Sequence, residues 1–419
     1  MKINHPIWHP YTQEKTALNP LIIKRAKGAF LYGANGEKIY DAISSWWVNI
    51  HGHNHPYIRE KINNSLFEQI IIAGFIHEPA ISLSKRVLKL FDNYYSKVFF
   101  TDNGSTAVES ALKMALQFFK NQGIKRKKIL ALNNGFHGET FGARAVSNSL
   151  ENIEDLCKGV FDVTFIDPPL RGLGMAPFLK MEKILNTPDD FAAFIFEPLV
   201  QGVAGMRMQD PQVLDQMIKL AKEKGIICIA DEVMTGFGRT GKMFATDYLE
   251  NKPDIICLAK ALTGGTLPLA LTLCTPLIYE PFFSDDPSKT FLYGHSYAGN
   301  ALACAAAHAS LDLLEDPKMP EIWNEINKSH KTFAKDLEGH PSILEIRILG
   351  TIVAIEYKSE ENGYFSALGP KMKSFFKERN VLLRPLGNII YILPPYCSTL
   401  DDLKLAYQAI FDFTQEQTK

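Results

Sequence analysis

A regular alternation of short apolar runs with amphipathic segments, across the middle of the chain, constrains the fold most strongly. The segments 106–120 and 211–225 repeat apolar residues at the i, i+3, i+4 spacing of a helix that packs on one face. Uniformly apolar strands that alternate with such helices predict an α/β fold, in which helices cover both faces of a mostly parallel sheet. The predicted strands of this sheet are 97–100, 128–132, 163–167, 192–196, 226–231, 254–259 and 269–274.

The last third of the chain has a different pattern, typical of a smaller α+β unit. A long helix is expected over 299–316, and strands within 347–357 and 388–395 alternate with further helices. Near the start of the chain, Asn35-Gly36 predicts the turn of a hairpin.

A chain of 419 residues is long enough for about two domains. We therefore expect a large domain, a small domain, and an N-terminal segment that packs with the small domain. The boundaries predicted for these three parts are 1–52 for the N-terminal segment, 53–305 for the large domain and 306–419 for the small domain.

Composition and charge exclude several classes of protein. The formal net charge is −1, so neither nucleic acid nor an anionic membrane is favoured as a partner. No apolar run approaches the ~20 residues of a membrane-spanning helix, and the first ten residues lack the apolar core of a signal peptide. The six cysteines are scattered without a CxxC pair, which favours buried free thiols in a reducing, cytoplasmic compartment.

Two strand ends carry residues suited to binding or catalysis, and ligands of such sheets bind beyond these ends. Gly104 and Ser105 stand at a helix start, where backbone N–H groups attract an anion, although helix capping alone would explain the same residues. Asp231 ends another strand, where a carboxylate needs a cation or a hydrogen-bond donor.

The glycines from Gly236 to Gly241 satisfy the motif GxGxxG. The acids before them disfavour a dinucleotide site, so a loop that buries the strand end is expected instead.

A third strand end carries Lys260. A desolvated lysine has a lowered pKa and becomes a nucleophile, although a lysine that reaches water from a strand edge would leave the same pattern. Together the three ends supply what pyridoxal phosphate needs: a helix start for the phosphate, an acid for the pyridinium nitrogen and a lysine for the Schiff base. Phe136 and Val233 are placed to enclose the ring, although both could be ordinary core residues.

These stretches together resemble the class III aminotransferases. The similarity runs from about residue 5 to the C-terminus, and it implies the fold-type I architecture of pyridoxal-phosphate enzymes. By position, it implies Lys260 as the Schiff-base lysine and Asp231 as the pyridinium partner. It also implies Gly104 and Ser105 at the phosphate and Phe136 on the ring. The stretches that carry the resemblance are FTDNGSTAVESALKMA (100–115), NNGFHGETFGARAVS (133–147), DEVMTGFGRTGKMFA (231–245), PDIICLAKALTGG (253–265) and GHSYAGNALACAAA (294–307).

The resemblance also implies a homodimer with shared active sites. In this family the segment that matches Gly294, His295 and Ser296 reaches across the dimer to the partner's phosphate. Ser296 is therefore expected at the cofactor, and Gly294 beside the substrate.

The stretches WHPYT (8–12) and DAISSWW (41–47) resemble one subgroup of the family, which acts in biotin synthesis. Its members transfer an amine from S-adenosylmethionine to the keto acid 8-amino-7-oxononanoate by a ping-pong mechanism. A long alkyl chain favours a flat apolar wall, which Trp46 or Trp47 could supply, with Tyr11 at the pocket mouth. Adjacent residues of a strand face opposite sides, so Trp46 is expected to face the substrate and Trp47 to face away.

Arg384 is the candidate for the distant carboxylate of the keto acid, because it is a lone charge in an apolar stretch and matches the subgroup's arginine. The alternative is a structural arginine paired with an acid such as Glu197. Three positions depart from the subgroup pattern: Phe136, Glu139 and His295. They leave recognition of the keto acid intact, and they leave the amino donor open between S-adenosylmethionine and lysine.

The alternating histidines His51, His53 and His55 raise a metal site as an alternative. Glycine and asparagine lie between them and no acid or cysteine ligand is near, so histidines at a turn and at the cap of a helix that begins at Pro56 are favoured. No metal is therefore expected.

Three rival functions remain. One is another class III transaminase, acting on a diamine, ornithine or γ-aminobutyrate. The others are a zinc hydrolase that uses the histidines and a non-catalytic binding protein.

Overall fold

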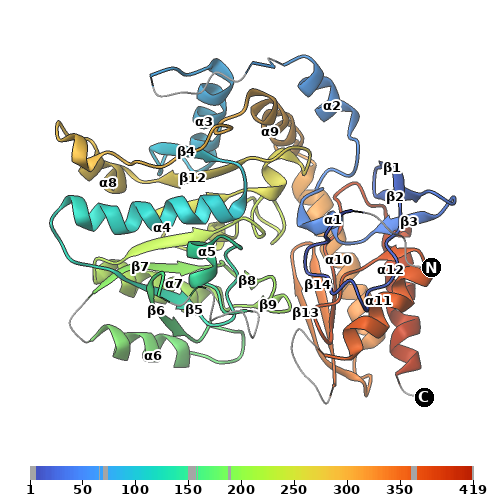
Figure 1. The fold of residues 1–419 in the computed structure, drawn as a ribbon. Coiled ribbons are helices and arrows are strands. Elements are labelled where there is room, and N and C mark those ends of the chain that lie inside the picture. The colour runs from blue at the N-terminus through green and yellow to red at the C-terminus, as the bar shows by residue number, and fades with distance from the viewer. Residues whose placement is uncertain are drawn as a thin grey trace.

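The structure, a computed structural model, describes residues 6–65, 67–68, 74–149, 157, 159–186, 190–359 and 366–417. Two parts of the chain lie side by side (Figure 1). The larger part is built on a central sheet, and the smaller part holds antiparallel strands and the C-terminal helices.

The central sheet confirms the predicted α/β class. Its strand order is β4-β12-β11-β10-β7-β5-β6, and β12 runs antiparallel to both of its neighbours while the other described pairs are parallel. Every run predicted for this sheet overlaps one of its strands, and the bounds agree to within one residue at each end. The bounds are β4 Lys97–Thr101, β5 Lys128–Leu132, β6 Asp162–Ile166, β7 Phe191–Phe196, β10 Ile227–Asp231, β11 Ile255–Leu258 and β12 Ala270–Cys274.

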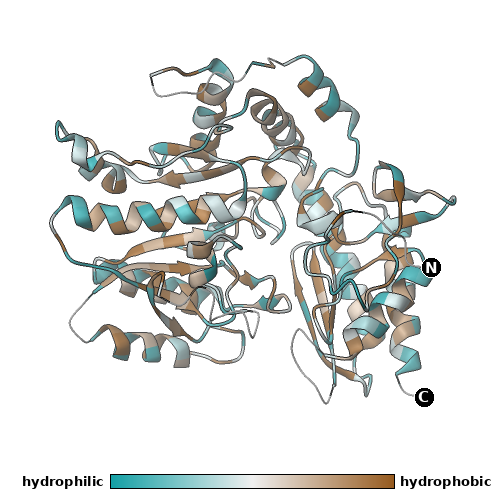
Figure 2. Ribbon diagram, in the orientation of Figure 1, coloured by the Kyte–Doolittle hydropathy of each residue, from teal (hydrophilic) through white to brown (hydrophobic). Residues whose placement is uncertain are grey.

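Both faces of the central sheet are buried, which explains why its strands are apolar without alternation. Successive side chains of a strand point to opposite faces, and neighbours such as Phe194 and Ile195 belong to different apolar clusters. The helix α4 (Gly104–Asn121) packs on the face of Ile195, and Figure 2 shows its alternating polar and apolar residues. Helices on the other face are α3 (Glu78–Leu90), α6 (Ala176–Leu185) and α7 (Pro211–Glu223).

The smaller part contains the sheet β13-β14-β16. The predicted strand 347–357 is in fact the end of one strand and the whole of the next, joined by a turn at Gly350. Gly350 has φ +57°, and a Cβ on it would lie 2.2 Å from the carbonyl carbon of Thr240, so the turn requires glycine. The bounds are β13 Ile343–Leu349, β14 Ile352–Tyr357, β16 Ile389–Ile392, α10 Met319–Leu337, α11 Leu368–Glu378 and α12 Leu400–Glu416.

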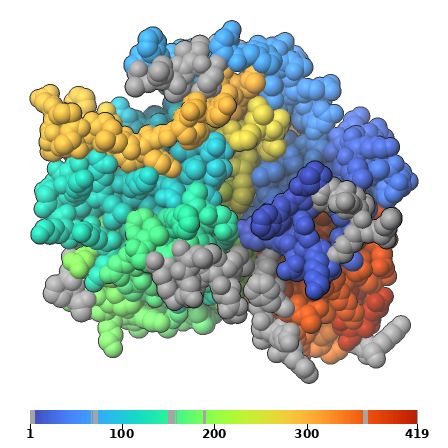
Figure 3. Space-filling model, viewed as in Figure 1, coloured from blue at the N-terminus to red at the C-terminus, as the bar shows by residue number. Residues whose placement is uncertain are grey.

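The N-terminal strands share a sheet with a strand of the C-terminal part. The hairpin predicted at Asn35-Gly36 is present, and its second strand pairs in parallel with β15. Figure 3 shows the N-terminal segment, in dark blue, on the surface beside both parts. The predicted domain boundaries stay a prediction, and the boundary between residues 305 and 306 falls inside α9. The bounds are β1 Ile23–Lys27, β2 Phe30–Gly33, β3 Lys38–Asp41, β15 Val381–Leu382 and α9 Ala301–Leu314.

The remaining elements are short. The helix predicted from Pro56 begins there and ends at Asn63. In the described part of the chain, no helix has the length and apolar character to cross a membrane. The cysteines are free and buried as expected, except Cys397, which is exposed because it follows β16 in a surface loop. The short elements are α1 Ser44–Trp47, α2 Pro56–Asn63, α5 Phe141–Ala145, α8 Pro276–Tyr279, β8 Val200–Gln201, β9 Arg207–Met208 and the 3₁₀ turns η2 Ala245–Tyr248, η3 Lys260–Thr263, η4 Glu280–Phe282 and η5 Pro287–Lys289.

Candidate active site

A cavity of about 670 Å³ lies beyond the C-terminal ends of β4, β10 and β11. It brings together most of the site residues that the sequence predicts. Its wall includes Trp46, Trp47, Gly104, Ser105, Phe136, Asp231, Val233 and Lys260. Tyr11 and Arg384 lie beside Trp46 at the mouth, whereas Gly294 and Ser296 stand on an exposed segment and do not line the cavity.

One end of the cavity is the start of α4. The Asn103 side chain caps the helix by accepting from the N–H of Thr106 at 3.0 Å. The N–H groups of Gly104 and Ser105, in the first turn, have no partner within the helix and carry its positive dipole end. A Cβ on Gly104 would lie 2.7 Å from Cγ1 of Val233, so glycine keeps the backbone open at this point. This end of the cavity can hold a phosphate.

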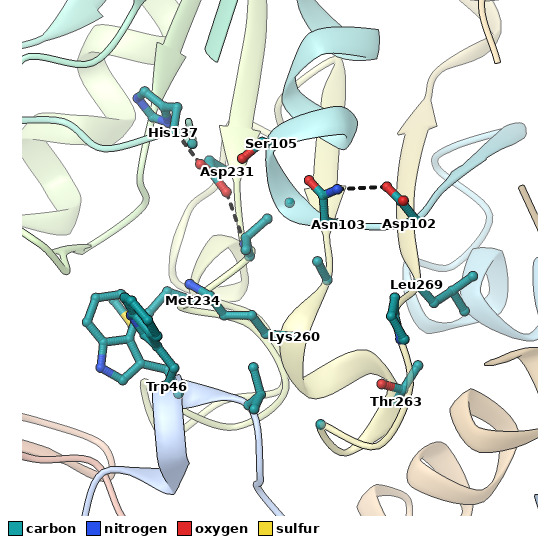
Figure 4. Close-up of a pocket in the computed structure, with 18 of the residues that line it drawn as sticks. Trp46, Asp102, Asn103, Ser105, His137, Asp231, Met234, Lys260, Thr263 and Leu269 are labelled. Carbon is teal, nitrogen blue, oxygen red and sulfur yellow. Dashed lines mark hydrogen bonds and ion pairs between the residues drawn. The ribbon is translucent and has the colours of Figure 1, made fainter. Parts of the chain in front are cut away.

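Asp231, the last residue of β10, lies on the next part of the wall and is only 5% exposed. Its Oδ2 is 2.8 Å from Nδ1 of His137, and its Oδ1 accepts from the N–H of Val233 at 3.1 Å (Figure 4). Since the carboxylate can only accept, Nδ1 of His137 carries the proton. These two bonds hold the Asp231 carboxylate in one orientation on the cavity wall.

Lys260 follows β11 and begins the turn η3. Its φ of +48° is in the left-handed region, which costs a lysine about 1–3 kcal/mol and persists only if the surroundings enforce it. The Nζ lies 4.6 Å from the centre of the Trp47 ring, and Figure 4 shows the side chain extending toward the tryptophans. Burial lowers the pKa of Lys260 to about 8, although the charge of Asp231 acts in the opposite direction. The amine is therefore poised to be neutral close to physiological pH.

Glu197 is another acid on the cavity wall. Its carboxylate accepts from the N–H of Phe136 and the N–H of Gly202, both at 2.9 Å. Burial raises its pKa to about 7, assisted by the nearby charge of Asp231. The bond from the N–H of Phe136 fixes the main chain there, so this carboxylate helps to place the Phe136 ring in the cavity.

The mouth of the cavity is built from three segments that are far apart in the chain. The rings of Tyr11 and Trp46 are 5.5 Å apart in an edge contact. The guanidinium carbon of Arg384 lies 4.3 Å from the Trp46 ring centre and 5.4 Å from that of Tyr11. The Tyr11 hydroxyl donates to Glu139, one of the three positions that depart from the subgroup pattern. An arginine beside two aromatic rings suits a ligand with an apolar chain and a carboxylate.

The two tryptophans do not face opposite sides as predicted. That prediction assumed a strand, but the segment is the short, irregular turn α1, in which Ser45 has φ 60° and ψ −88°. Both tryptophans consequently line the cavity. Trp46 is 38% exposed at the mouth, whereas Trp47 is 3% exposed and donates from Nε1 to the Tyr391 hydroxyl at 2.9 Å.

The alternating histidines have separate partners. His51 is bonded to Ser310 and His53 to Asp41. His55 occupies the N-cap position of α2 as predicted, but its side chain makes no capping bond. Within the described residues, no group of three or more histidine, cysteine or acidic side chains is arranged to hold a metal ion.

Sequence reasoning missed His137, the partner of Asp231, and it considered Glu197 only as a partner of Arg384. The available signal for His137 was its place directly after Phe136 in GFHGET.

For the GxGxxG stretch, the predicted buried loop is confirmed: Phe237 and Arg239 are both 0% exposed. Glu232, which precedes this loop, accepts from the Thr235 hydroxyl and from the N–H of Thr246 and so ties the loop to the strand end.

The residues on the cavity wall fit pyridoxal phosphate. The start of α4 would hold the phosphate, Asp231 the ring nitrogen and Lys260 the aldehyde carbon. Phe136 and Val233 would enclose the flat ring. Gly138 supports the fit, because its φ is +132° and a Cβ on it would lie 2.3 Å from the Ser105 hydroxyl, so a side chain there would displace Ser105.

Comparison with known proteins points to one family. The family model described as aminotransferase class III matches residues 11–413. The adenosylmethionine-8-amino-7-oxononanoate aminotransferase of Synechococcus elongatus is 44% identical over 99% of both chains, and that of Helicobacter pylori is 37% identical over 99% of this chain and 97% of its own. The crystal structure of the Methanocaldococcus jannaschii enzyme of the same name matches with a TM-score of 0.89 and 34% identity over 98% of this chain and 97% of its own. An amine transaminase from an uncultivated Pseudomonas species, solved in its PLP-bound form, matches with a TM-score of 0.87 and 27% identity over 98% of both chains.

Proposed function

The chain belongs to the class III aminotransferases, whose characteristic cofactor is pyridoxal phosphate, and on this premise we propose its specific reaction. It transfers an amino group to 8-amino-7-oxononanoate to give 7,8-diaminononanoate, a step of biotin synthesis. The amino donor is S-adenosylmethionine, and the two half-reactions follow each other in a ping-pong sequence. Relatives that cover nearly the full length of the chain carry both compounds in their names, which supports the proposal.

The observation that carries the proposal is the cluster of Trp46, Tyr11 and Arg384 at the cavity mouth. The keto acid has a long apolar chain that ends in a carboxylate. The aromatic rings offer a flat apolar surface for the chain. The guanidinium offers two parallel donors for the carboxylate, a geometry that lysine lacks.

The chemistry requires an electron-withdrawing group bonded to the substrate amine, and bound pyridoxal phosphate supplies it. Asp231 keeps a negative charge at the ring nitrogen, and His137 holds this carboxylate in place at 2.8 Å. The start of α4 would hold the phosphate and so keep the bound cofactor in place beside Lys260.

Lys260 has two tasks. As an amine it would hold the cofactor. When free, it would take the proton from the carbon that bears the donor nitrogen and deliver it on the cofactor side, and in the second half-reaction it would carry a proton in the opposite direction, to the acceptor carbon. Both tasks require a neutral amine, and burial increases the neutral fraction near physiological pH by lowering the pKa of Lys260 to about 8.

Two alternatives concern substrates of the same chemistry. One is the same acceptor with lysine as donor, which the departures at Phe136, Glu139 and His295 leave open. The other is a class III transaminase that acts on ornithine, γ-aminobutyrate or a diamine. The aromatic and arginine cluster favours a long acceptor with a terminal carboxylate over these smaller substrates.

We further propose that the enzyme is a cytoplasmic homodimer, in which Gly294 and Ser296 reach the partner's cofactor site. Large apolar side chains flank these residues at the surface, since Leu292 is 85% and Tyr297 is 69% exposed. Exposed apolar groups at one place favour a protein interface. Loss of activity in Ser296→Ala, with wild-type melting behaviour, is expected if the segment completes the partner's site.

The deciding experiment separates the two half-reactions. The holoenzyme is mixed with S-adenosylmethionine or with lysine, and the absorbance of the bound cofactor is followed. We expect conversion to the amino form with S-adenosylmethionine and reversal on addition of 8-amino-7-oxononanoate, with Lys260→Ala as the inactive control. Conversion by lysine alone would correct the donor. Failure of 8-amino-7-oxononanoate to restore the original spectrum would refute the proposed acceptor.

A further inference from the structure

The HGH stretch that follows the tandem tryptophans connects to both walls of the cavity. Gly52, between the two histidines, has φ +83°, and a Cβ on it would lie 2.5 Å from the Cys397 sulfur. Only glycine fits at this turn. The turn lets the side chains of His51 and His53 reach different partners, Ser310 and Asp41 respectively.

His51 reaches the lysine turn through one hydroxyl group. Its Nε2 is 3.0 Å from Oγ of Ser310, and this hydroxyl donates to the carbonyl of Ala261, also at 3.0 Å. The hydroxyl has a single proton, which Ala261 receives, so Nε2 of His51 must be the donor to Ser310. Burial lowers the pKa of His51 to about 3, so the imidazole stays neutral, with its single ring proton on Nε2.

The carbonyl of Ala261 belongs to the turn that begins at Lys260. It also accepts from the N–H of Gly264 at 2.8 Å, which closes the turn. A Cβ on Gly264 would lie 3.0 Å from Cδ2 of His51, so the imidazole packs directly against the turn. His51 and Ser310 therefore support the left-handed backbone of Lys260 from behind the cavity wall.

His53 supports the tryptophan turn in a similar way. Its Nε2 is 2.7 Å from Oδ2 of Asp41, which is 0% exposed. The same carboxylate accepts from the N–H of Ser45 at 2.7 Å. Ser44, Ser45 and Trp47 have φ values of 52°, 60° and 67°, so the turn is strained and depends on such bonds.

The main chain of His53 is itself anchored. It pairs with Gly28, with N–O distances of 2.7 and 3.0 Å. The backbone of His53 is thus attached to the turn between β1 and β2, and its imidazole holds Asp41 in place relative to that turn. The tryptophan turn is held at a fixed place relative to the cavity.

We propose that His51 and His53 are positioning residues for the two walls of this active site. His51 places Lys260 through Ser310 and the carbonyl of Ala261, and His53 places Trp46 and Trp47 through Asp41. The part that concerns His51 requires only membership of the family. The part that concerns His53 rests on the proposed function, because Trp46 is assigned to the acceptor there.

The first test compares His51→Leu with His51→Gln in the holoenzyme, since a glutamine amide can replace the Nε2 donor. Three readouts are taken: the pH midpoint of the cofactor absorbance, amide hydrogen exchange over residues 260–264, and the rate of the half-reaction with the donor amine. We expect His51→Leu to shift the midpoint, to speed exchange in the turn and to slow the half-reaction by about 10- to 100-fold. His51→Gln recovers most of each effect, and Ser310→Ala reproduces His51→Leu. A wild-type midpoint and rate in His51→Leu would overturn the role of His51.

The second test applies the same readouts to His53→Leu and His53→Gln, and adds the KM for 8-amino-7-oxononanoate. We expect His53→Leu to raise this KM by about tenfold, to change the cofactor absorbance and the donor half-reaction much less, and to be rescued by glutamine. An unchanged KM, or an equal change in both half-reactions, would overturn the role of His53. If the wild-type enzyme does not use this keto acid, the proposed function is refuted. The test of His51 remains valid, because its readouts need only the donor amine.

His330→Gln is the matched control. His330 is also buried, and it is bonded to the Tyr407 hydroxyl at 2.7 Å and to the Thr351 carbonyl at 3.1 Å, in the smaller part of the chain. We expect a lower melting temperature and unchanged cofactor absorbance, donor rate and acceptor KM. If His330→Gln changed these quantities as His51→Leu or His53→Leu does, loss of stability would explain the results and the proposal would fail.

Discussion

The two ends of the active-site cavity are built in different ways. The cofactor end uses the ends of β4, β10 and β11 in one sheet, and its acid, Asp231, is 5% exposed. The substrate end uses Tyr11, Trp46 and Arg384 from three separate segments, and Tyr11 and Trp46 are 44% and 38% exposed. The chemistry that all members of the family share is placed on rigid elements. The residues that we assign to substrate choice stand on segments that can change without disturbing the sheet.

Among variants of the cofactor end, Lys260→Ala is expected to cause the largest loss of turnover. We expect the variant to bind pyridoxal phosphate and to lose turnover by about 10⁴-fold, because both the attachment point and the general base are lost. Steady-state rates and the absorbance of bound cofactor measure the effect. Lys242→Ala, which removes a lysine that stacks on Tyr248 outside the cavity, is the control and should retain the wild-type rate. Near-normal turnover of Lys260→Ala would contradict the mechanism.

Asp231→Asn tests whether charge or shape matters at the same end. Asparagine can still accept from the N–H of Val233, but the negative charge at the ring nitrogen is lost, so we expect the donor half-reaction to slow by about 10²- to 10³-fold. Stopped-flow absorbance gives the rate. The adjacent Glu232→Gln is the matched control, because Glu232 bonds to Thr235 and Thr246 and does not line the cavity. It should lower the melting temperature and leave the rate unchanged, and equal losses in both variants would argue against a specific role for Asp231.

Arg384→Gln tests the substrate end. Loss of a charge-assisted pair should raise the KM for 8-amino-7-oxononanoate by about 10- to 100-fold and change kcat less, because the carboxylate is far from the reacting carbon. Initial rates over a range of acceptor concentrations give both constants. Arg384→Lys should recover only part of the loss. Arg379→Gln, which removes an arginine stacked on Phe375 at the surface, should leave KM unchanged. A fall in kcat with constant KM would place Arg384 at the chemistry instead.

The pH dependence of cofactor attachment is the smallest effect and concerns the cofactor end. Only neutral Lys260 can attack the aldehyde, and burial lowers its pKa to about 8. As pH falls below 8, the protonated fraction grows, so the rate at which apoenzyme combines with pyridoxal phosphate should fall by about tenfold per pH unit and should level off above 8. Absorbance after rapid mixing measures this rate. A rate that keeps rising above pH 9, as for an exposed lysine, would show that burial does not tune the amine.

Most of the cofactor end was predictable from sequence. Apolar runs identify the strands, and the residue after each run is placed near the others because parallel strands end at one edge of a sheet. Asp231 and Lys260 are therefore both expected at this edge, and the structure brings them to one cavity. The bond from His137 to Asp231 was not predicted, because no local periodicity reports which side chain a loop presents to a strand end.

The substrate end was predicted in composition but not in geometry. The resemblance to a subgroup identified Tyr11, Trp46 and Arg384, but the strand assumed for the tryptophans was wrong. Backbone bonds to the buried Asp41 hold a strained turn instead, and both rings line the cavity. The strain could not be foreseen, because it persists only where tertiary contacts offset its cost.

The sequence by itself determined the α/β class, the strands of the central sheet and the residues at their ends, because hydrophobic periodicity is a local property of the chain. Only the tertiary structure decided which distant residues meet. It placed Arg384 on Trp46, and it gave His51 and His53 their partners Ser310 and Asp41. Such contacts depend on how separate elements pack, and a side chain's neighbours across a fold leave no periodic trace in the sequence.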